Sequence, residues 1–138
     1  MDVIMMIGIA LSGKTTYRET NFDHEVIQLS YFNNNRKREL EYIEECLKEG
    51  KSIVIDDTNL TREIRKTHID LARKYNAQVT GIFMNTSTGL IEQRRLRRRN
   101  SFPVAVINKQ LRDLETPTKE EGFDKLIVHK DYVQPRDT

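Results

Sequence analysis

The sequence has one cysteine, no tryptophan and only three prolines among its 138 residues, and its longest apolar run is short. The single cysteine, Cys46, cannot form a disulfide within the chain, so a reduced, cytoplasmic setting is expected. The apolar run covers residues 3–11, about half the length that a membrane-spanning helix needs. It follows Asp2 rather than a basic segment, which argues against a signal peptide. We therefore expect a cytoplasmic protein that does not associate with membranes.

A large net charge is also lacking. The 23 basic and 21 acidic residues leave a net charge of only +2, so the chain as a whole does not have the basic balance of a nucleic-acid binder. The positive charge is instead concentrated in residues 94–99, RRLRRR, where five of six positions are arginine. A cluster of this density creates a local positive field that attracts phosphate-rich ligands.

Apolar runs suited to buried strands alternate along the chain with amphipathic segments suited to helices. The expected strands cover residues 3–7, 25–29, 52–55, 78–84 and 125–128. The expected helices cover residues 14–19, 36–49, 61–75, 88–98 and 104–114. This alternation predicts an α/β fold, a parallel five-stranded sheet with helices on both faces. Residues 1–138 are expected to form one domain, and the polar tail, about residues 130–138, is expected to be loose.

A glycine-bearing segment follows the first expected strand. Residues 8–15 read GIALSGKT and match G-x-x-x-x-G-K-[ST] in full. The two glycines let the backbone curl so that successive N–H groups form an anion nest beside a helix N-terminus. Lys14 is expected to contact the β- and γ-phosphates of ATP, and the Thr15 hydroxyl to join the Mg²⁺ shell of a P-loop NTPase or kinase fold. The predicted ATP-binding residues are Gly8, Ala10, Leu11, Ser12, Gly13, Lys14, Thr15 and Thr16.

Two neighbouring carboxylates end the third expected strand. The segment IVIDDTN places Asp56 and Asp57 at the carboxyl end of that strand, where open α/β sheets bind ligands. A carboxylate in this position can hold magnesium through water or orient an attacking hydroxyl, although either residue alone can also cap the turn into the next helix. Asp56, together with Thr15, is the predicted magnesium ligand.

The arginine cluster has two interpretations. Most charge runs form a solvated helix face, but five arginines in six positions repel one another on a single stripe. In phosphoryl transfer, arginines placed over the phosphates neutralise the charge of the transition state. We predict that at least one of these arginines has this second role.

These motifs, with the segment FPVAVINKQLRDLETPTKEEGFDKL, resemble the kinase module of polynucleotide 5′-kinases that repair nucleic-acid ends. The resemblance covers nearly the whole chain and implies ATP, Mg²⁺ and the 5′-hydroxyl end of DNA or RNA as acceptor. It implies that Asp57 is the acidic group beside the acceptor and that Asn59 lies in the same element. It also implies an arginine-bearing lid at about residues 92–103.

The register of the lid comes from the same resemblance. With Pro103 as the anchor, the family pattern R-N-x-x-R aligns with Arg94 and Arg98, which would clamp the phosphates. Arg99 and Asn100 imitate the same pattern, so a shifted register stays open. The implied catalytic residues are Lys14, Asp57, Arg94 and Arg98.

The sequence departs from the family after its second expected strand. Where the family has an aspartate that takes the proton of the accepting hydroxyl, this chain has Ser30, which cannot act as a base at neutral pH. Arg36 aligns loosely with an arginine that contacts the acceptor phosphate. The acceptor-binding residues that the resemblance implies are therefore Ser30, Arg36, Asp57 and Asn59. Three readings stay open: a slow 5′-kinase, a kinase of a small molecule or nucleoside, and an ATP-binding protein with weak or no transferase activity.

The sequence also leaves several properties open. They are the choice between DNA and RNA, the purine preference of the donor, the oligomeric state, and a separate phosphatase or ligase as partner. The three histidines show no metal-ligand spacing. His68 lies in the apolar stripe of the helix at residues 61–75 and is predicted to be a core histidine with satisfied nitrogens.

Overall fold

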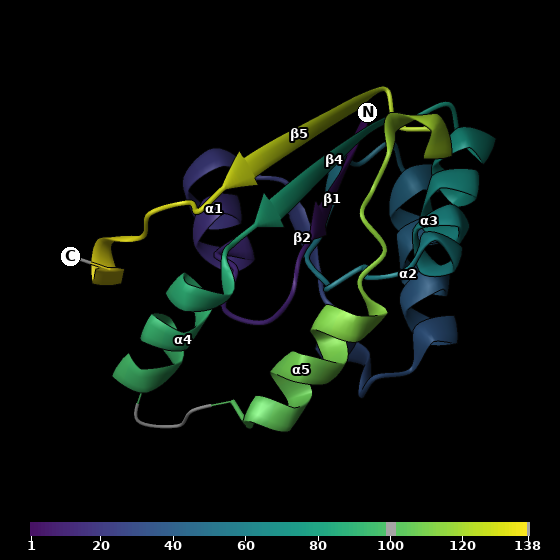
Figure 1. The fold of residues 1–138 in the computed structure, drawn as a ribbon. Coiled ribbons are helices and arrows are strands. Elements are labelled where there is room, and N and C mark those ends of the chain that lie inside the picture. The colour runs from purple at the N-terminus through teal and green to yellow at the C-terminus, as the bar shows by residue number, and fades with distance from the viewer. Residues whose placement is uncertain (99–101, 138) are drawn as a thin grey trace.

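The computed structural model describes residues 1–98 and 102–137 of the chain (Figure 1). Its strands are β1 (Asp2–Ile7), β2 (Glu25–Ile27), β3 (Ile53–Ile55), β4 (Gln78–Asn85) and β5 (Lys125–Lys130). Its helices are α1 (Lys14–Asn21), α2 (Arg36–Lys48), α3 (Arg62–Lys74), α4 (Thr88–Arg97) and α5 (Val104–Asp113), with 3-10 turns η1 (Leu29–Phe32), η2 (Lys119–Glu121) and η3 (Pro135–Asp137). The five strands form one parallel sheet in the order β2-β3-β1-β4-β5.

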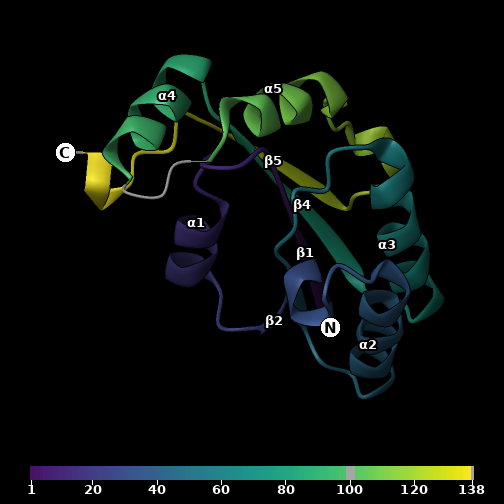
Figure 2. The same ribbon diagram turned by 90° about the horizontal axis from the view of Figure 1, so that it is seen from below.

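The alternating side chains of β1 enter two separate cores. Val3, Met5 and Ile7 pack in a large cluster with residues of α2 and α3. Ile4 and Met6 pack on the opposite face, against aromatic residues of α1 and of the segment after β5. Figure 2 shows α1 on one side of the sheet and α2 and α3 on the other. The predicted parallel sheet with helices on both faces is therefore confirmed.

Helices α4 and α5 lie beyond the carboxyl ends of the strands. Ile91 of α4 and Ile107 of α5 are buried with Ile9 and Leu60, which belong to the loops that follow β1 and β3. This third cluster holds the two helices over the edge of the sheet where those loops begin. Among the helices of residues 1–98 and 102–137, none is long and apolar enough to cross a membrane.

A buried ion pair connects α3 to the segment before β5. Arg65 is completely buried, and its Nε and Nη2 atoms donate to the Glu121 carboxylate at 2.8 and 3.1 Å. The same guanidinium donates to the carbonyl oxygens of Asn59, Leu60 and Glu115. A buried arginine with five donors needs this many acceptors, so the pair fixes the path of the chain into β5.

The asparagines after η1 have backbone roles. Asn33 and Asn34 have positive φ angles of 53° and 61°, a region that asparagine tolerates better than most residues. Asn35 caps α2, because its side chain accepts a hydrogen bond from the Arg38 N–H at 3.2 Å. These residues turn the chain sharply between η1 and α2.

The predicted loose tail is not observed in the described residues. β5 continues to Lys130, and Tyr132 then packs against the core on the α1 face of the sheet. Asp137 pairs with the buried guanidinium of Arg94 at 2.8 Å. The sequence-based expectation of a free tail from about residue 130 is therefore wrong, because polar residues of the tail find partners on α4 and α1.

Candidate nucleotide and acceptor site

The loop between β1 and α1 has the backbone that a phosphate site requires. Gly13 has a φ angle of 101° and stands at the N-cap of α1. Gly8 has a φ angle of 156°, and a Cβ atom there would lie only 2.6 Å from Ser12 Oγ. Glycine is therefore required at both positions. Because the first turn of a helix leaves its N–H groups without intrahelical acceptors, this curled loop presents donors suited to phosphate oxygens.

Lys14 lies across this loop. Its Nζ atom donates to the carbonyl oxygens of Gly8 at 2.8 Å and Ile9 at 2.7 Å. Burial lowers the pKa of the Lys14 ammonium to about 8, partly offset by the negative charges of Asp56 and Asp57. A triphosphate would add negative charge next to this group and favour its charged form.

The structure brings the two predicted magnesium ligands together. The Thr15 hydroxyl donates to Asp56 Oδ2 at 3.1 Å, and the Asp56 side chain is 2% exposed. The same carboxylate oxygen accepts from Arg18 Nε at 3.1 Å and from Gln28 Nε2 at 3.4 Å. Hydroxyl and carboxylate oxygens are the protein ligands that Mg²⁺ prefers, so this donor set fits the ion. Arg18 was missed from the sequence, although its i+3 spacing from Thr15 places both on one face of α1.

Asp56→Asn is expected to weaken the apparent affinity for Mg²⁺ in any ATP-dependent reaction of this chain by about 10–100-fold, because a neutral amide oxygen replaces a carboxylate. The measurement is a Mg²⁺ titration of activity at fixed ATP. Asp23→Asn, at an exposed position, serves as the matched control. An unchanged Mg²⁺ requirement in Asp56→Asn would exclude this residue as a ligand.

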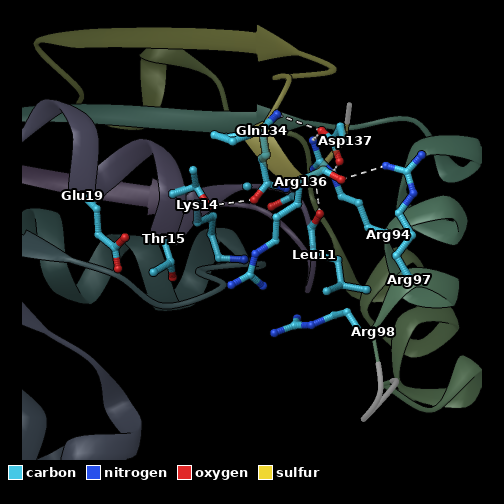
Figure 3. Close-up of a pocket in the computed structure, with 14 residues that line it drawn as sticks. Leu11, Lys14, Thr15, Glu19, Arg94, Arg97, Arg98, Gln134, Arg136 and Asp137 are labelled. Carbon is cyan, nitrogen blue, oxygen red and sulfur yellow. Dashed lines mark hydrogen bonds and ion pairs between the residues drawn. The ribbon is translucent and has the colours of Figure 1, made fainter.

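A pocket of about 1060 Å³ opens beside the loop (Figure 3). That volume is enough for a nucleotide. Its cationic side chains outnumber its acidic ones. The lining residues are Leu11, Ser12, Gly13, Lys14, Thr15, Thr16, Glu19, Arg94, Arg97, Arg98, Gln134, Pro135, Arg136 and Asp137.

Arg94 is placed differently from the sequence-based expectation. Its side chain is 5% exposed, and its guanidinium donates to the carbonyl oxygens of Leu11 and Tyr132 and to the Asp137 carboxylate. These contacts tie α4 to the phosphate loop and to the tail, so Arg94 holds the pocket wall rather than projecting over it. Burial of an arginine inside a charge run is not visible in sequence periodicity.

The other arginines of the run diverge. Arg95 pairs at 2.6 Å with Glu92, which lies three residues earlier in α4. Arg97 donates to the Arg136 carbonyl at 2.9 Å, while the Arg98 guanidinium lies 5.7 Å from the Phe102 ring centroid. Figure 3 shows Arg98 extending away from α4 across the pocket. The alternative register through residues 99 and 100 lies outside the described residues.

The tail supplies pocket residues that the sequence did not indicate. The Thr16 hydroxyl lies 2.7 Å from the side-chain amide of Gln134, and the Gln134 N–H donates to Asp137 at 2.8 Å. The first contact joins α1 to a residue 118 positions later in the chain, and the second lies within the tail itself. No sequence motif marks them, because the tail reaches the pocket only after β5 has joined the sheet.

A second group of predicted residues meets next to η1. Asp57 Oδ1 accepts from the Leu29 N–H at 2.7 Å, and Asp57 Oδ2 accepts from Arg36 at 3.4 Å. Ser30 is exposed, and its hydroxyl donates to Gln28 Oε1 at 3.3 Å. The structure therefore gathers the three predicted acceptor residues Ser30, Arg36 and Asp57 around the turn η1.

Asn59 does not join this group. It is 1% exposed, and its amide donates to the Met6 carbonyl at 2.7 Å under the sheet edge. Its φ angle of 48° is one that asparagine adopts readily. Its side-chain amide instead holds the loop after β3 against β1, away from Ser30, Arg36 and Asp57.

Two buried groups lie behind Asp57. Burial, together with the interaction with Asp57, raises the pKa of the Glu39 carboxyl to about 8, although the neighbouring Arg36 acts in the opposite direction. Burial lowers the pKa of His68 to about 4. His68 was predicted to have satisfied nitrogens, but neither ring nitrogen has a hydrogen-bond partner in the described structure.

A parallel sheet with a phosphate loop between β1 and α1, and with carboxylates at the end of the neighbouring strand, defines a P-loop protein of the kinase type. Residues 3–117 match the family described as "AAA domain", and the chain belongs to that family.

Two curated proteins are similar in sequence to most of this chain. It is 29% identical over 133 residues to the bifunctional polynucleotide phosphatase/kinase of Schizosaccharomyces pombe, covering 88% of this chain and 32% of the relative. It is 28% identical over 141 residues to the Arabidopsis thaliana protein called transcription factor bHLH140, covering 91% of this chain and 15% of the relative. The chain thus spans a third or less of these relatives, and the resemblance to polynucleotide kinases is confirmed.

Solved structures share the fold at low sequence identity. A sugar kinase from Janibacter sp. HTCC2649 superposes with a TM-score of 0.72 at 19% identity, covering 98% of this chain and 88% of that one. Kti12 from Chaetomium thermophilum, in complex with ADP-AlF3, superposes with a TM-score of 0.68 at 16% identity, covering 98% and 92%. These likenesses confirm the P-loop kinase fold and are too distant to transfer a substrate.

Proposed function

We propose that this chain is an ATP-dependent kinase that transfers the γ-phosphate to the 5′-hydroxyl end of DNA or RNA. The observation that carries the proposal is the placement of two groups at one sheet edge. The phosphate loop with Thr15 and Asp56 lies on one side, and η1 with Arg36 and Asp57 lies on the other. Asp56 joins them, because its carboxylate contacts both Thr15 and Gln28, the residue that precedes η1.

The donor half of the reaction rests on charge and backbone geometry. The loop N–H groups and Lys14 hold the β- and γ-phosphates, while Arg98 and Arg136 line the wall of the same pocket. Thr15 and Asp56 would hold Mg²⁺, which when bound neutralises charge on the phosphates. Arg94 keeps the wall in place through Leu11 and Asp137.

The acceptor half uses the residues around η1. Arg36 is a third exposed in its side chain, so its guanidinium is accessible to an acceptor phosphate. Asp57 fixes both η1 and Arg36, because its carboxylate accepts from the Leu29 N–H and from the Arg36 guanidinium. Tyr31 is 60% exposed beside them and offers a ring face to a base, whereas Phe32 packs against Tyr42 in the core.

The missing aspartate limits the rate rather than the type of reaction. Phosphoryl transfer proceeds through a loose transition state in which positioning and charge neutralisation contribute most. A general base adds about 10²–10⁴-fold. A serine at position 30 is therefore compatible with a slow kinase.

The direct test incubates the protein with Mg²⁺, γ-labelled ATP and 5′-hydroxyl oligonucleotides of DNA and RNA. Label transfer is expected to the 5′-hydroxyl ends and not to 5′-phosphorylated controls. Oligonucleotide binding should weaken steeply with salt, because several phosphates are contacted. Label transfer only to a nucleoside or sugar, with salt-insensitive binding, would replace the acceptor proposed here. ATP binding without any transfer would favour a nucleotide-dependent binding protein.

Ser30→Asp should raise the transfer rate about 10-fold or more, because it supplies a carboxylate where a base adds to the rate. Ser30→Asn is the matched control, because asparagine has the size of aspartate without its charge, and this variant should not accelerate transfer. The measurement is kcat with a 5′-hydroxyl oligonucleotide at saturating ATP. Equal rates in the two variants would show that position 30 does not face the accepting hydroxyl.

A further inference from the structure

Three potential metal ligands meet behind the acceptor residues. Glu39 comes from α2, Asp57 follows β3, and His68 comes from α3. One ligand atom from each lies within 4.8 Å of the other two. The three elements are far apart in the sequence and converge only because α2 and α3 pack beside each other on the same face of the sheet.

Two of these side chains are buried and incompletely bonded. His68 is 1% exposed, and neither Nδ1 nor Nε2 has a hydrogen-bond partner in the part of the chain that the structure describes. Glu39 is fully buried, and its Oε2 atom likewise has no hydrogen-bond partner there. Leaving a buried polar atom without a partner costs about 1–3 kcal/mol, and an ion bound to Glu39 Oε2 and to one His68 nitrogen would remove part of that cost.

The charge of the cluster favours a cation as that ligand. Arg36 is the cation that contacts the carboxylates, at 2.8 Å from Glu39 Oε1 and 3.4 Å from Asp57 Oδ2. A bound metal ion displaces the proton of a carboxyl ligand, so the guanidinium then faces two carboxylates and leaves one excess negative charge for the ion to neutralise. The neutral imidazole of His68 adds one nitrogen with a lone pair that can bind a metal ion.

We propose that Glu39, Asp57 and His68 bind a divalent transition metal. One imidazole nitrogen with two carboxylate oxygens is a ligand set that suits Zn²⁺, with ligand distances of about 2.0–2.2 Å and a water molecule completing the tetrahedron. The bound metal links α2, the end of β3 and α3, and stabilises the fold beneath Arg36 and the turn η1.

This site differs from the magnesium position at Thr15 and Asp56. Its ligands come from the α2 and α3 side of the sheet edge and include an imidazole, which Mg²⁺ does not favour. Its existence does not depend on kinase activity or on the identity of the acceptor. It can therefore be tested in the full chain without any nucleotide.

The experiment measures Zn²⁺ content and thermal stability of the full chain after EDTA treatment and dialysis. Adding Zn²⁺ should load about one ion per chain and raise Tm by about 5–10 °C at a hundredfold excess over Kd. His68→Leu should abolish the Tm shift and keep a folded metal-free protein, because it removes two unpaired buried nitrogens at similar volume. Glu39→Gln, which conserves shape, should weaken Zn²⁺ binding about 10–100-fold.

His24→Ala is the matched control, because it removes a partly exposed histidine that lies next to Asp23. This variant should bind Zn²⁺ and shift in Tm like the unmodified chain. Retention of the ion by both His68→Leu and Glu39→Gln, or loss of it in His24→Ala, would assign the binding to the surface and overturn the proposal. The absence of any Zn²⁺-dependent Tm shift in the unmodified chain would do the same.

Discussion

Lys14→Ala is expected to lower the rate of ATP-dependent phosphoryl transfer by about 10²–10³-fold. The ammonium group lies on the phosphate loop, within hydrogen-bond distance of the Gly8 and Ile9 carbonyls. A triphosphate bound by the loop would replace these carbonyls as its partners, and charge developing on the γ-phosphate would then be neutralised at short range. Alanine removes that charge without changing the glycines that shape the loop.

The measurement is kcat and KM for ATP with the acceptor that accepts label most efficiently. Lys66→Ala is the matched control, because Lys66 is exposed on α3 and pairs only at the surface with Asp70. Thermal unfolding of both variants should be nearly unchanged, which separates a catalytic loss from misfolding. Full activity in Lys14→Ala would contradict the assignment of the phosphate loop.

Glu121→Ala is expected to lower the free energy of unfolding by about 3–5 kcal/mol. The loss is large because Arg65, which is fully buried, would keep its charge without a counterion. The substitution would also remove the capping contact in which Glu121 accepts from the Thr118 N–H at 2.8 Å. The corresponding fall in Tm is roughly 10 °C or more for a domain of this size.

Urea denaturation of the variant and of the unmodified chain measures this difference. The matched control is Glu92→Ala, because Glu92 also pairs with an arginine but its side chain is half exposed. An exposed pair contributes at most about 1 kcal/mol, so the two variants should separate clearly. Equal destabilisation by both would show that burial does not determine the strength of these ion pairs.

The parallel sheet and the phosphate loop were predictable because each depends on local pattern. Short apolar runs predicted the strands, and the loop motif identified Lys14 and Thr15 from adjacent residues alone. Boundaries were less accurate. The second strand ends at Ile27 rather than Leu29, because the chain turns into η1 there and Leu29 bonds to Asp57.

The contacts that combine distant segments were not predictable in the same way. Arg94 lies within a charge run that reads as a solvated or phosphate-facing stripe, yet it is buried because Asp137 returns from the tail to meet it. His68 reads as a core histidine with satisfied nitrogens, but it is unpaired beside Glu39. Both outcomes depend on partners that lie about thirty to forty residues away.

For this chain, the periodicity of apolar residues was sufficient to predict the α/β class, because it reflects the local structure of single helices and strands. A contiguous motif was sufficient to predict the phosphate loop, because adjacent residues form that loop. The positions of Asp56, Asp57 and the arginines relative to one another are decided by packing. Whether a charged side chain projects into a pocket or pairs in the interior depends on which helices and which tail segment cover it. That covering exists only once the sheet has brought together the ends of strands that are remote in sequence.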